Sequence, residues 1–246
     1  MNSKAQGDGC VTFLLSFVLL ISGCFTGLAT AQDPELQQKV AELKQAMANN
    51  QQALAQYTWV EQVNVVLKGE EKKQEHFQVR LGPDGKPQKT SLDQPPQSSS
   101  DSGGRRRGRL KEHVVEKKKE EYKEYADRMK SLIQQYVPPD KDLLEQARQQ
   151  GNIMMGPQAG EPGQYRLVIS NYLKKSDNMT LVIDKTHKGI VSVSIASYLD
   201  DPKDAVNVSV QFSSIPGGPN HVSAATINGV SKQLTITIQN SNYQRL

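Results

Sequence analysis

Hydrophobic residues in the second half of the chain recur at every other position, which is the pattern of half-buried β-strands. From residue 164 onward, runs of Val, Ile and Leu alternate with Ser, Thr, Asn, Gln and Arg, and turn residues separate the runs. The apolar positions of this alternation include Val191, Val193, Ile195, Val222 and Ala224. One apolar and one polar face predict an antiparallel sheet over 164–246 whose apolar face is covered by other elements.

The first part of the chain changes from a helical to a strand period. Apolar residues at spacings near 3.6 predict an amphipathic helix over 33–56. The spacing then becomes two, with Tyr57, Trp59 and Val63 on one face of a first strand. Turn residues at 68–71 and 82–85 separate this strand from two further strands. Residues 32–93 are therefore predicted to form a helix followed by a three-stranded meander.

Residues 110–151 are predicted to be helical. A stripe from Tyr122 to Tyr136 gives the second half of a helix over 110–137 one apolar face, whereas its first half is almost entirely charged. Asp140 is placed to cap a shorter helix that stops at Gly151. Helices and antiparallel strands together predict an α+β fold, in which the amphipathic helices are the available covers for the sheet.

Residues 1–31 read as a secretory signal peptide. An apolar run of 11 residues from Val11 to Ile21 has the length of a signal h-region, and 29–31 (Ala-Thr-Ala) fit a cleavage signature. A second interpretation stays open, because 21–24 (Ile-Ser-Gly-Cys) resemble a bacterial lipobox in which Cys24 is acylated. Either form predicts a periplasmic or secreted protein, with a lipid-anchored envelope protein as the alternative. Both remove or modify the only two cysteines, so neither a disulfide nor a cysteine nucleophile is expected.

Residues 94–109 have the composition of a flexible, Arg-rich linker. Between Arg105 and Lys119 there are eight cations and two anions, and this local excess is larger than the net charge of +4 of the whole chain. The basic character is therefore local, and it makes contact with an anionic membrane or envelope polymer an alternative to a solvated linker. The candidate contact residues are Arg105, Arg106, Arg107 and Arg109. Nucleic acid is not an expected partner, because no aromatic residues interleave with these arginines.

Motifs that would indicate an enzyme are missing from the sequence. It contains no phosphate-binding loop and no nucleophile elbow, and its four histidines do not fall at ligand spacings. Asp200, Asp201 and Asp204 could bind a hard cation, but Pro202 and the flanking strands explain them as turn residues, and no Gly or Glu completes a calcium loop. The sequence therefore predicts a non-enzymatic protein without a cofactor or metal.

Two segments carry a resemblance to a known class of proteins. They are 57–59 (Tyr-Thr-Trp), which open the first strand, and 179–186 (Met-Thr-Leu-Val-Ile-Asp-Lys-Thr), which precede a turn and the next strand. With the order of helix, meander, helices and strands, they make the chain similar to the periplasmic lipoprotein-sorting carriers. The resemblance implies a strongly curved antiparallel sheet, a half-barrel, covered by amphipathic helices around an apolar cavity for acyl chains. Parts of the chain also look like secreted bacterial proteins of unassigned function.

These observations lead to one expected function and two alternatives. The expected function is binding of a lipid or lipoprotein acyl chain between sheet and helices. The candidate cavity residues are Leu167, Ile169, Leu181, Ile183, Val193, Ile195, Val210 and Ile236. The first alternative is an interaction module of the same α+β fold, with a filled core, that uses its basic arm on an anionic surface. The second is a hydrolase whose residues converge only in the folded chain.

Overall fold

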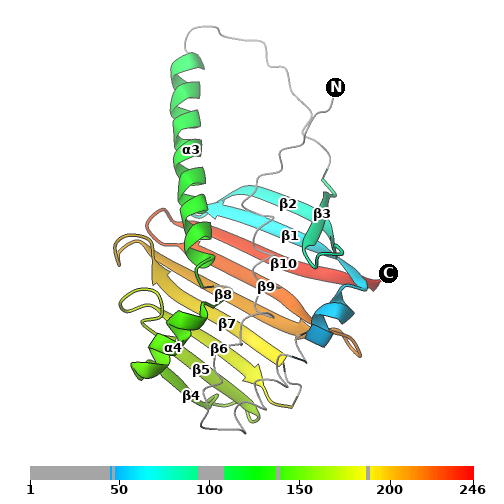
Figure 1. Cartoon of the computed structure of the whole chain (residues 1–246). Helices are drawn as coiled ribbons and strands as arrows, with labels where there is room; N and C mark the ends of the chain where they lie inside the picture. Colours follow the sequence, from blue (N-terminus) through cyan, green and yellow to red (C-terminus); the bar gives the residue numbers. More distant parts are fainter. Residues whose placement is uncertain (1–44, 46–47, 94–107, 137–138, 187–188) are drawn as a thin grey trace.

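The protein has an α+β fold built on one ten-stranded antiparallel sheet (Figure 1). The computed structural model describes residues 45, 48–93, 108–136, 139–186 and 189–246. The predicted signal peptide and most of the first helix and of the Arg-rich linker lie outside these residues. The strands are β1 (Tyr57–Leu67), β2 (Glu70–Leu81), β3 (Pro87–Ser91), β4 (Ile153–Pro157), β5 (Gln164–Ser170), β6 (Asn178–Asp184), β7 (Gly189–Tyr198), β8 (Ala205–Ser214), β9 (Asn220–Gly229) and β10 (Leu234–Arg245).

The strand order is β3-β2-β1-β10-β9-β8-β7-β6-β5-β4. The predicted meander is confirmed as β1 to β3, and the predicted C-terminal strands are confirmed as β5 to β10. The last strand pairs with the first over almost its whole length, from Leu67 opposite Leu234 to Tyr57 opposite Arg245. This pairing joins the two strand regions into a single sheet. β3 and β4 are its edge strands, and the sheet is not closed.

The turn between β1 and β2 follows the rules for a tight hairpin. Lys68 and Gly69 both have positive φ, at 53° and 79°. A two-residue loop with positive φ at both positions matches the right-handed twist of the flanking strands. The glycine adopts this conformation without steric cost, whereas Lys68 does so under the constraint of the pairing on either side.

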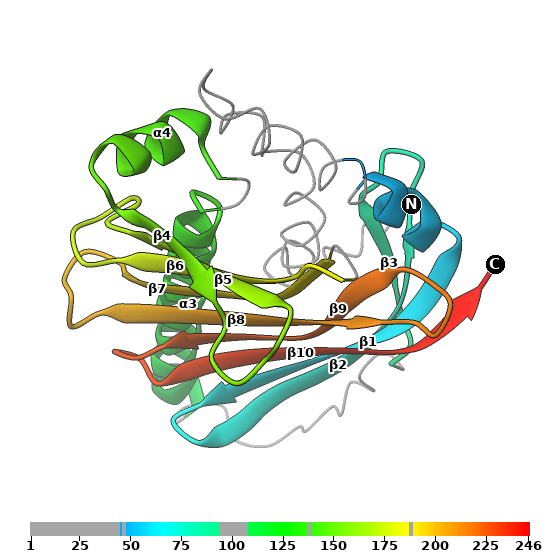
Figure 2. The same ribbon diagram turned by 90° about the horizontal axis from the view of Figure 1, so that it is seen from below.

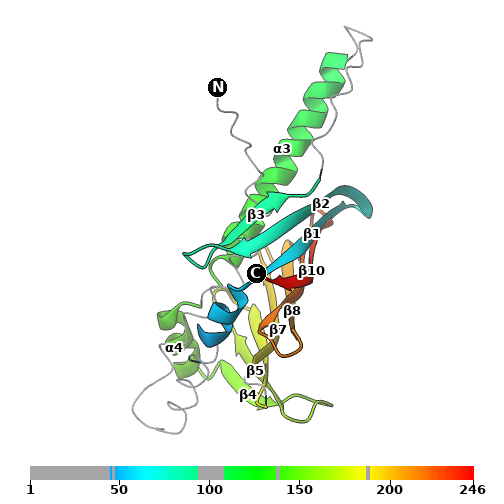
Figure 3. The same cartoon turned by 90° about the vertical axis from the view of Figure 1, so that its right-hand side faces the viewer.

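The helices lie on one side of the sheet (Figures 2 and 3). They are residues 48–54, α3 (Gly108–Ile133) and α4 (Lys141–Gln149). The carboxylate of Asp140 accepts hydrogen bonds from the N–H groups of Asp142 and Leu143, which confirms the predicted cap of α4. Asn50 exchanges two hydrogen bonds with the backbone of Asn220, at 2.8 and 2.6 Å, which attach residues 48–54 to the start of β9.

The core lies between these helices and the facing side of the sheet. Buried residues of α3 and the turn after it form one cluster with the sheet: Tyr125, Met129, Leu132, Ile133 and Tyr136. Leu144 and Ala147 of α4 belong to the same cluster. Figure 1 shows the first turns of α3 projecting past the sheet, in agreement with the charged first half of this helix.

Three details of the predicted strands were wrong. β4 falls in the interval between 151 and 164, where no strand was predicted, and its short sequence, which includes Gly156 and Pro157, does not alternate clearly. Register shifts account for the other two. Because of the shift between Val182 and Ile183, Ile190 is buried, whereas Val191 was predicted to be. Because of the shift between Gln211 and Phe212, Ala225 is buried, whereas Ala224 was predicted to be. Each extra residue reverses the face on which later side chains lie.

Candidate functional site

The eight candidate cavity residues lie together on the face of the sheet that carries the helices. A first row contains residues that face one another in register across seven strands: Leu167, Leu181, Val193, Val210, Ala225, Ile238 and Val63. A second row runs beside it: Ile169, Met179, Ile195, Val208, Ile227, Ile236 and Val65. We call these two rows the apolar rows. They contain seven of the eight candidates, and Ile183 lies in the next register.

The apolar rows are largely buried. Six of the candidates are buried, with exposures of 1–5%: Ile169, Leu181, Val193, Ile195, Val210 and Ile236. Leu167 and Ile183 are half-buried and lie toward the β4 edge of the sheet. The buried members belong to the same hydrophobic cluster as the residues of α3 and α4. The sequence therefore identified a contiguous apolar face correctly.

A buried polar cluster continues this face on β1. Trp59, Glu61 and Val63 occupy alternate positions of β1, so the side chain of Glu61 points to the same side of the sheet as the other two. It is 0% exposed. Lys89 of the edge strand β3 reaches over Phe77 and donates a hydrogen bond to Glu61 Oε1, and its side chain is only 6% exposed. Burial raises the pKa of Glu61 and lowers the pKa of Lys89, and the ion pair opposes both shifts.

Aromatic rings border this ion pair. Trp59 and Tyr243 stack with ring centroids 5.5 Å apart, and the ring of His221 lies 3.9 Å from that of Tyr243. The hydroxyl of Tyr243 donates to the carbonyl of Val222 at 3.2 Å. Burial, assisted by the charge of Glu61, raises the pKa of Tyr243.

Three polar atoms in this region have no hydrogen-bond partner among the residues that the structure describes. They are Trp59 Nε1, Glu61 Oε2 and Asn240 Oδ1. Asn240 pairs directly with Glu61 across the strands, and its Nδ2 donates to the carbonyl of Val222 at 3.1 Å. We call Trp59, Glu61, Lys89, Asn240 and Tyr243 the Glu61 cluster. The sequence carried a signal for it, because Glu61 and Asn240 interrupt apolar alternations at inward positions.

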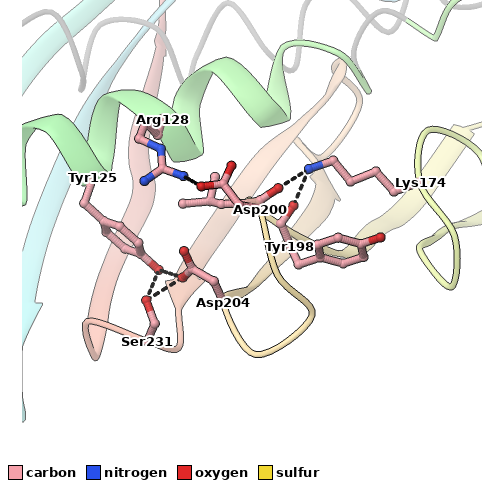
Figure 4. Close-up of polar contacts among 8 residues, drawn as sticks. Tyr125, Arg128, Lys174, Tyr198, Asp200, Asp204 and Ser231 are labelled. Atoms are coloured by element: carbon pink, nitrogen blue, oxygen red, sulfur yellow. Dashed lines mark hydrogen bonds and ion pairs between the residues drawn. The ribbon is translucent and has the colours of Figure 1, made fainter.

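Two of the three aspartates considered as a cation site, Asp200 and Asp204, instead attach α3 to the turn between β7 and β8 (Figure 4). Asp201 accepts a hydrogen bond from the backbone N–H of Lys203 within the same turn. Tyr125 donates to Asp204 Oδ1 at 2.9 Å, and Ser231 donates to the same oxygen. Arg128 pairs with Asp200, which lies in the same turn as Asp204. Among the described residues, no group of three or more metal-ligating side chains is close enough to hold a metal ion.

Lys174 completes the polar contacts at this end of the sheet (Figure 4). Its Nζ donates to the carbonyl of Tyr198 at 2.7 Å and to that of Leu199, and it lies 4.9 Å from the centre of the Tyr198 ring. The same lysine lines a cavity of about 380 Å³ between α4 and the loop after β5. The other lining residues are mostly polar and include none of the candidates: Leu143, Gln146, Ala147, Gln150, Asn152, Asn171, Tyr172, Leu173 and Lys175.

The basic candidates are described only in part. Arg105, Arg106 and Arg107 lie outside the residues that the structure describes, and Arg109 lies in the first turn of α3. No helix in the described part of the chain has both the length and the apolar character needed to cross a membrane.

Comparisons with known proteins give one similar structure. No family model matches the chain, and no curated protein matches it. The similar structure is the crystal structure of a DUF1329 family protein from Desulfovibrio piger ATCC 29098, with 12% sequence identity and a TM-score of 0.39. The alignment covers 87% of this chain and 94% of that one. A similarity of this size assigns no function.

Proposed function

We propose that the protein is a non-enzymatic cell-envelope protein that binds a lipid acyl chain, free or as part of a lipoprotein, against the apolar rows. The observation that carries this proposal is the composition of the rows: no polar side chain interrupts either of them across seven strands. With strands about 4.8 Å apart, six spacings give an apolar track of about 29 Å.

The chemistry of the rows suits an alkyl chain better than a sugar. Their side chains are Val, Ile, Leu, Met and Ala, without the aromatic rings or hydrogen-bonding groups with which a sugar would be recognised. Burial of a methylene group contributes about 0.8 kcal/mol. About ten buried methylenes would contribute about 8 kcal/mol, the scale of micromolar binding before the costs of association are subtracted.

A curved, helix-covered sheet is part of the same proposal. Register shifts interrupt four of the strand pairings, namely β1 with β10, β1 with β2, β6 with β7 and β8 with β9. Such irregularities bend a sheet and increase its twist. The position of α3, α4 and residues 48–54 on one side of the sheet further supports an acyl chain between the two layers (Figure 3).

A filled core is the competing interpretation, and one observation favours it. Six of the eight candidates are no more than 5% exposed and share a cluster with the helices. In that case the protein is an interaction module, and the segment around Arg105 to Arg109 contacts an anionic membrane or envelope polymer.

Binding of a fluorescent long-chain fatty acid to the purified mature protein distinguishes an acyl-binding protein from an interaction module. We expect saturable, micromolar binding, reduced at least about tenfold by Ile183→Glu, which places a charge beside the apolar rows. Ser194→Glu is the matched control, because Ser194 is an exposed residue between the inward-facing Val193 and Ile195 of β7. Circular dichroism of both variants checks the fold. Absence of binding to the native protein, together with binding to anionic vesicles that depends on Arg105 to Arg109, would favour the interaction module.

We expect the protein to be exported and its N-terminal signal peptide to be removed. The intact mass of the protein recovered from the envelope of an expressing bacterium should correspond to a chain that begins at Gln32 or at an acylated Cys24. Recovery of the full chain from Met1 would contradict both.

A further inference from the structure

We propose that the Glu61 cluster binds the headgroup of the lipid, and that this headgroup is neutral and bears hydroxyl groups. This inference rests on the acyl-binding function proposed for the apolar rows and identifies the chemical class of the lipid. The observation behind it is the set of three buried, unpartnered polar atoms at one end of the apolar rows.

The Glu61 cluster adjoins the first apolar row. Glu61 and Asn240 form a cross-strand pair, and each is two residues along its strand from the next inward-facing pair, Val63 and Ile238. Two residues of a strand span about 7 Å, which is the separation expected between a headgroup and the first methylenes of its chain. A lipid bound along the row would therefore bring its polar end to these side chains.

The unpartnered atoms define what the headgroup must offer. Trp59 Nε1 needs an acceptor, whereas Glu61 Oε2 and Asn240 Oδ1 need donors. Trp59, Glu61 and Asn240 are 1%, 0% and 9% exposed, so bulk water does not serve them. Buried polar groups in folded proteins are almost always hydrogen-bonded. Three such atoms on the cross-strand pair Glu61–Asn240 and on Trp59, two residues along β1, therefore indicate that a partner is missing.

Charge narrows the choice of headgroup. Glu61 is already neutralised by Lys89, so a charged ligand would bring an unpaired charge into a buried region. A phosphate or carboxylate would also offer no donor to Glu61 Oε2 or Asn240 Oδ1, and an ammonium group would offer no acceptor to Trp59. A pair of neighbouring hydroxyl groups supplies two donors and an acceptor without charge. Monoacylglycerol is the simplest lipid with this headgroup.

The chain contains a single tryptophan, and it belongs to the Glu61 cluster, so its fluorescence reports directly on headgroup binding. We would titrate the full mature protein with 1-monopalmitoylglycerol, palmitate and 1-palmitoyl lysophosphatidate, which share one acyl chain, whereas only the first bears a pair of neighbouring hydroxyl groups. We expect monopalmitoylglycerol to shift the Trp59 emission and to bind about tenfold more tightly than either of the other two, which corresponds to about one buried hydrogen bond.

Two variants assign the preference to the cluster. Asn240→Leu removes one unpartnered acceptor, and Trp59→Phe removes the unpartnered donor and keeps a ring beside Tyr243. Measured by calorimetry, each should lose the preference for monopalmitoylglycerol and keep the affinity for palmitate. Asn207→Leu, at an exposed position of β8, is the control and should keep both. Thermal melts of all three check the fold.

The outcomes distinguish failure of the headgroup assignment from failure of the acyl-binding function on which it rests. Equal affinities for the three lipids, unchanged by Asn240→Leu, would overturn the headgroup assignment and leave acyl binding in place. Binding of none of them would overturn both. A crystal structure of the monopalmitoylglycerol complex with only water at Glu61 and Asn240 would also overturn the assignment.

Discussion

The hydroxyl of Tyr136 donates a hydrogen bond to Asp177 Oδ2, with 2.5 Å between the oxygens. Asp177 is 2% exposed and also accepts from the backbone N–H groups of Tyr172, Leu173 and Lys174. Burial, together with the hydrogen bond to Asp177, raises the pKa of Tyr136, so this phenol stays a donor. The contact fixes the turn after α3 to the loop between β5 and β6 and so positions the helix over the sheet.

Removal of this hydroxyl should destabilise the protein. Tyr136→Phe takes away the donor to Asp177 and the partner of Ser197, 2.7 Å from the phenol oxygen, inside the core. Loss of hydrogen bonds to buried polar groups costs about 1–3 kcal/mol. Urea denaturation should show a decrease of this size in the free energy of unfolding. Tyr122→Phe, at a half-buried position of α3, is the control, and equal stability of the two variants would contradict the assignment.

Gly229 lets α3 approach the sheet closely. A Cβ atom at this position would lie 2.5 Å from Met129 Sδ and 2.6 Å from Tyr125 Cε1. Gly229→Ala should therefore displace the helix and lower the free energy of unfolding by about 1–3 kcal/mol. Gly156→Ala on β4 is the matched control, because a Cβ there meets nothing within 4 Å. Tyr125 would be released from Asp204 only in the Gly229 variant, and an unchanged melting temperature in that variant would contradict the close contact.

His221 should make stability depend on pH. Burial lowers its pKa, and the hydrogen bond between its ring and the carbonyl of Val222 only partly opposes this shift. Because the pKa in the folded protein lies below the unfolded value of about 6.5, the unfolded chain binds a proton more readily. The contribution to stability is complete above pH of about 6.5 and is lost as the pH falls through the folded pKa.

Thermal melts between about pH 7.5 and 5 test this linkage. The native protein should lose stability over this interval, and His221→Gln should lose less of it. A variant with the same pH dependence as the native protein would show that another group is responsible.

The sequence pattern predicted the strands in which apolar and polar residues alternate regularly. It missed the features that depend on how two strands pair. The alternation along β5 to β10 was sufficient to bring all eight candidates to one face, because the strand period is two. It placed Val191 and Ala224 wrongly, since a register shift is a property of two strands and leaves no mark in one of them. The pairing of β10 with β1 likewise joins residues that are far apart in the chain.

The Glu61 cluster shows the same limit at the level of the site. The alternation in β1 was enough to predict that Glu61 faces inward. The site, however, also requires Lys89 of β3, Asn240 of β10 and the nearby Trp59 of β1. Only the register of β3, β1 and β10 brings these side chains together. The unpartnered atoms become visible only when every neighbour is known.

Analysis of the lipid that accompanies the protein tests the central claim most directly. The mature protein would be purified without detergent from the envelope of an expressing bacterium, extracted with organic solvent, and the extract analysed by mass spectrometry. We expect an acyl lipid at about one molecule per chain, retained on gel filtration and reduced in Ile183→Glu but not in Ser194→Glu. Protein that carries no lipid, and takes up none when incubated with monopalmitoylglycerol or palmitate, would contradict acyl binding.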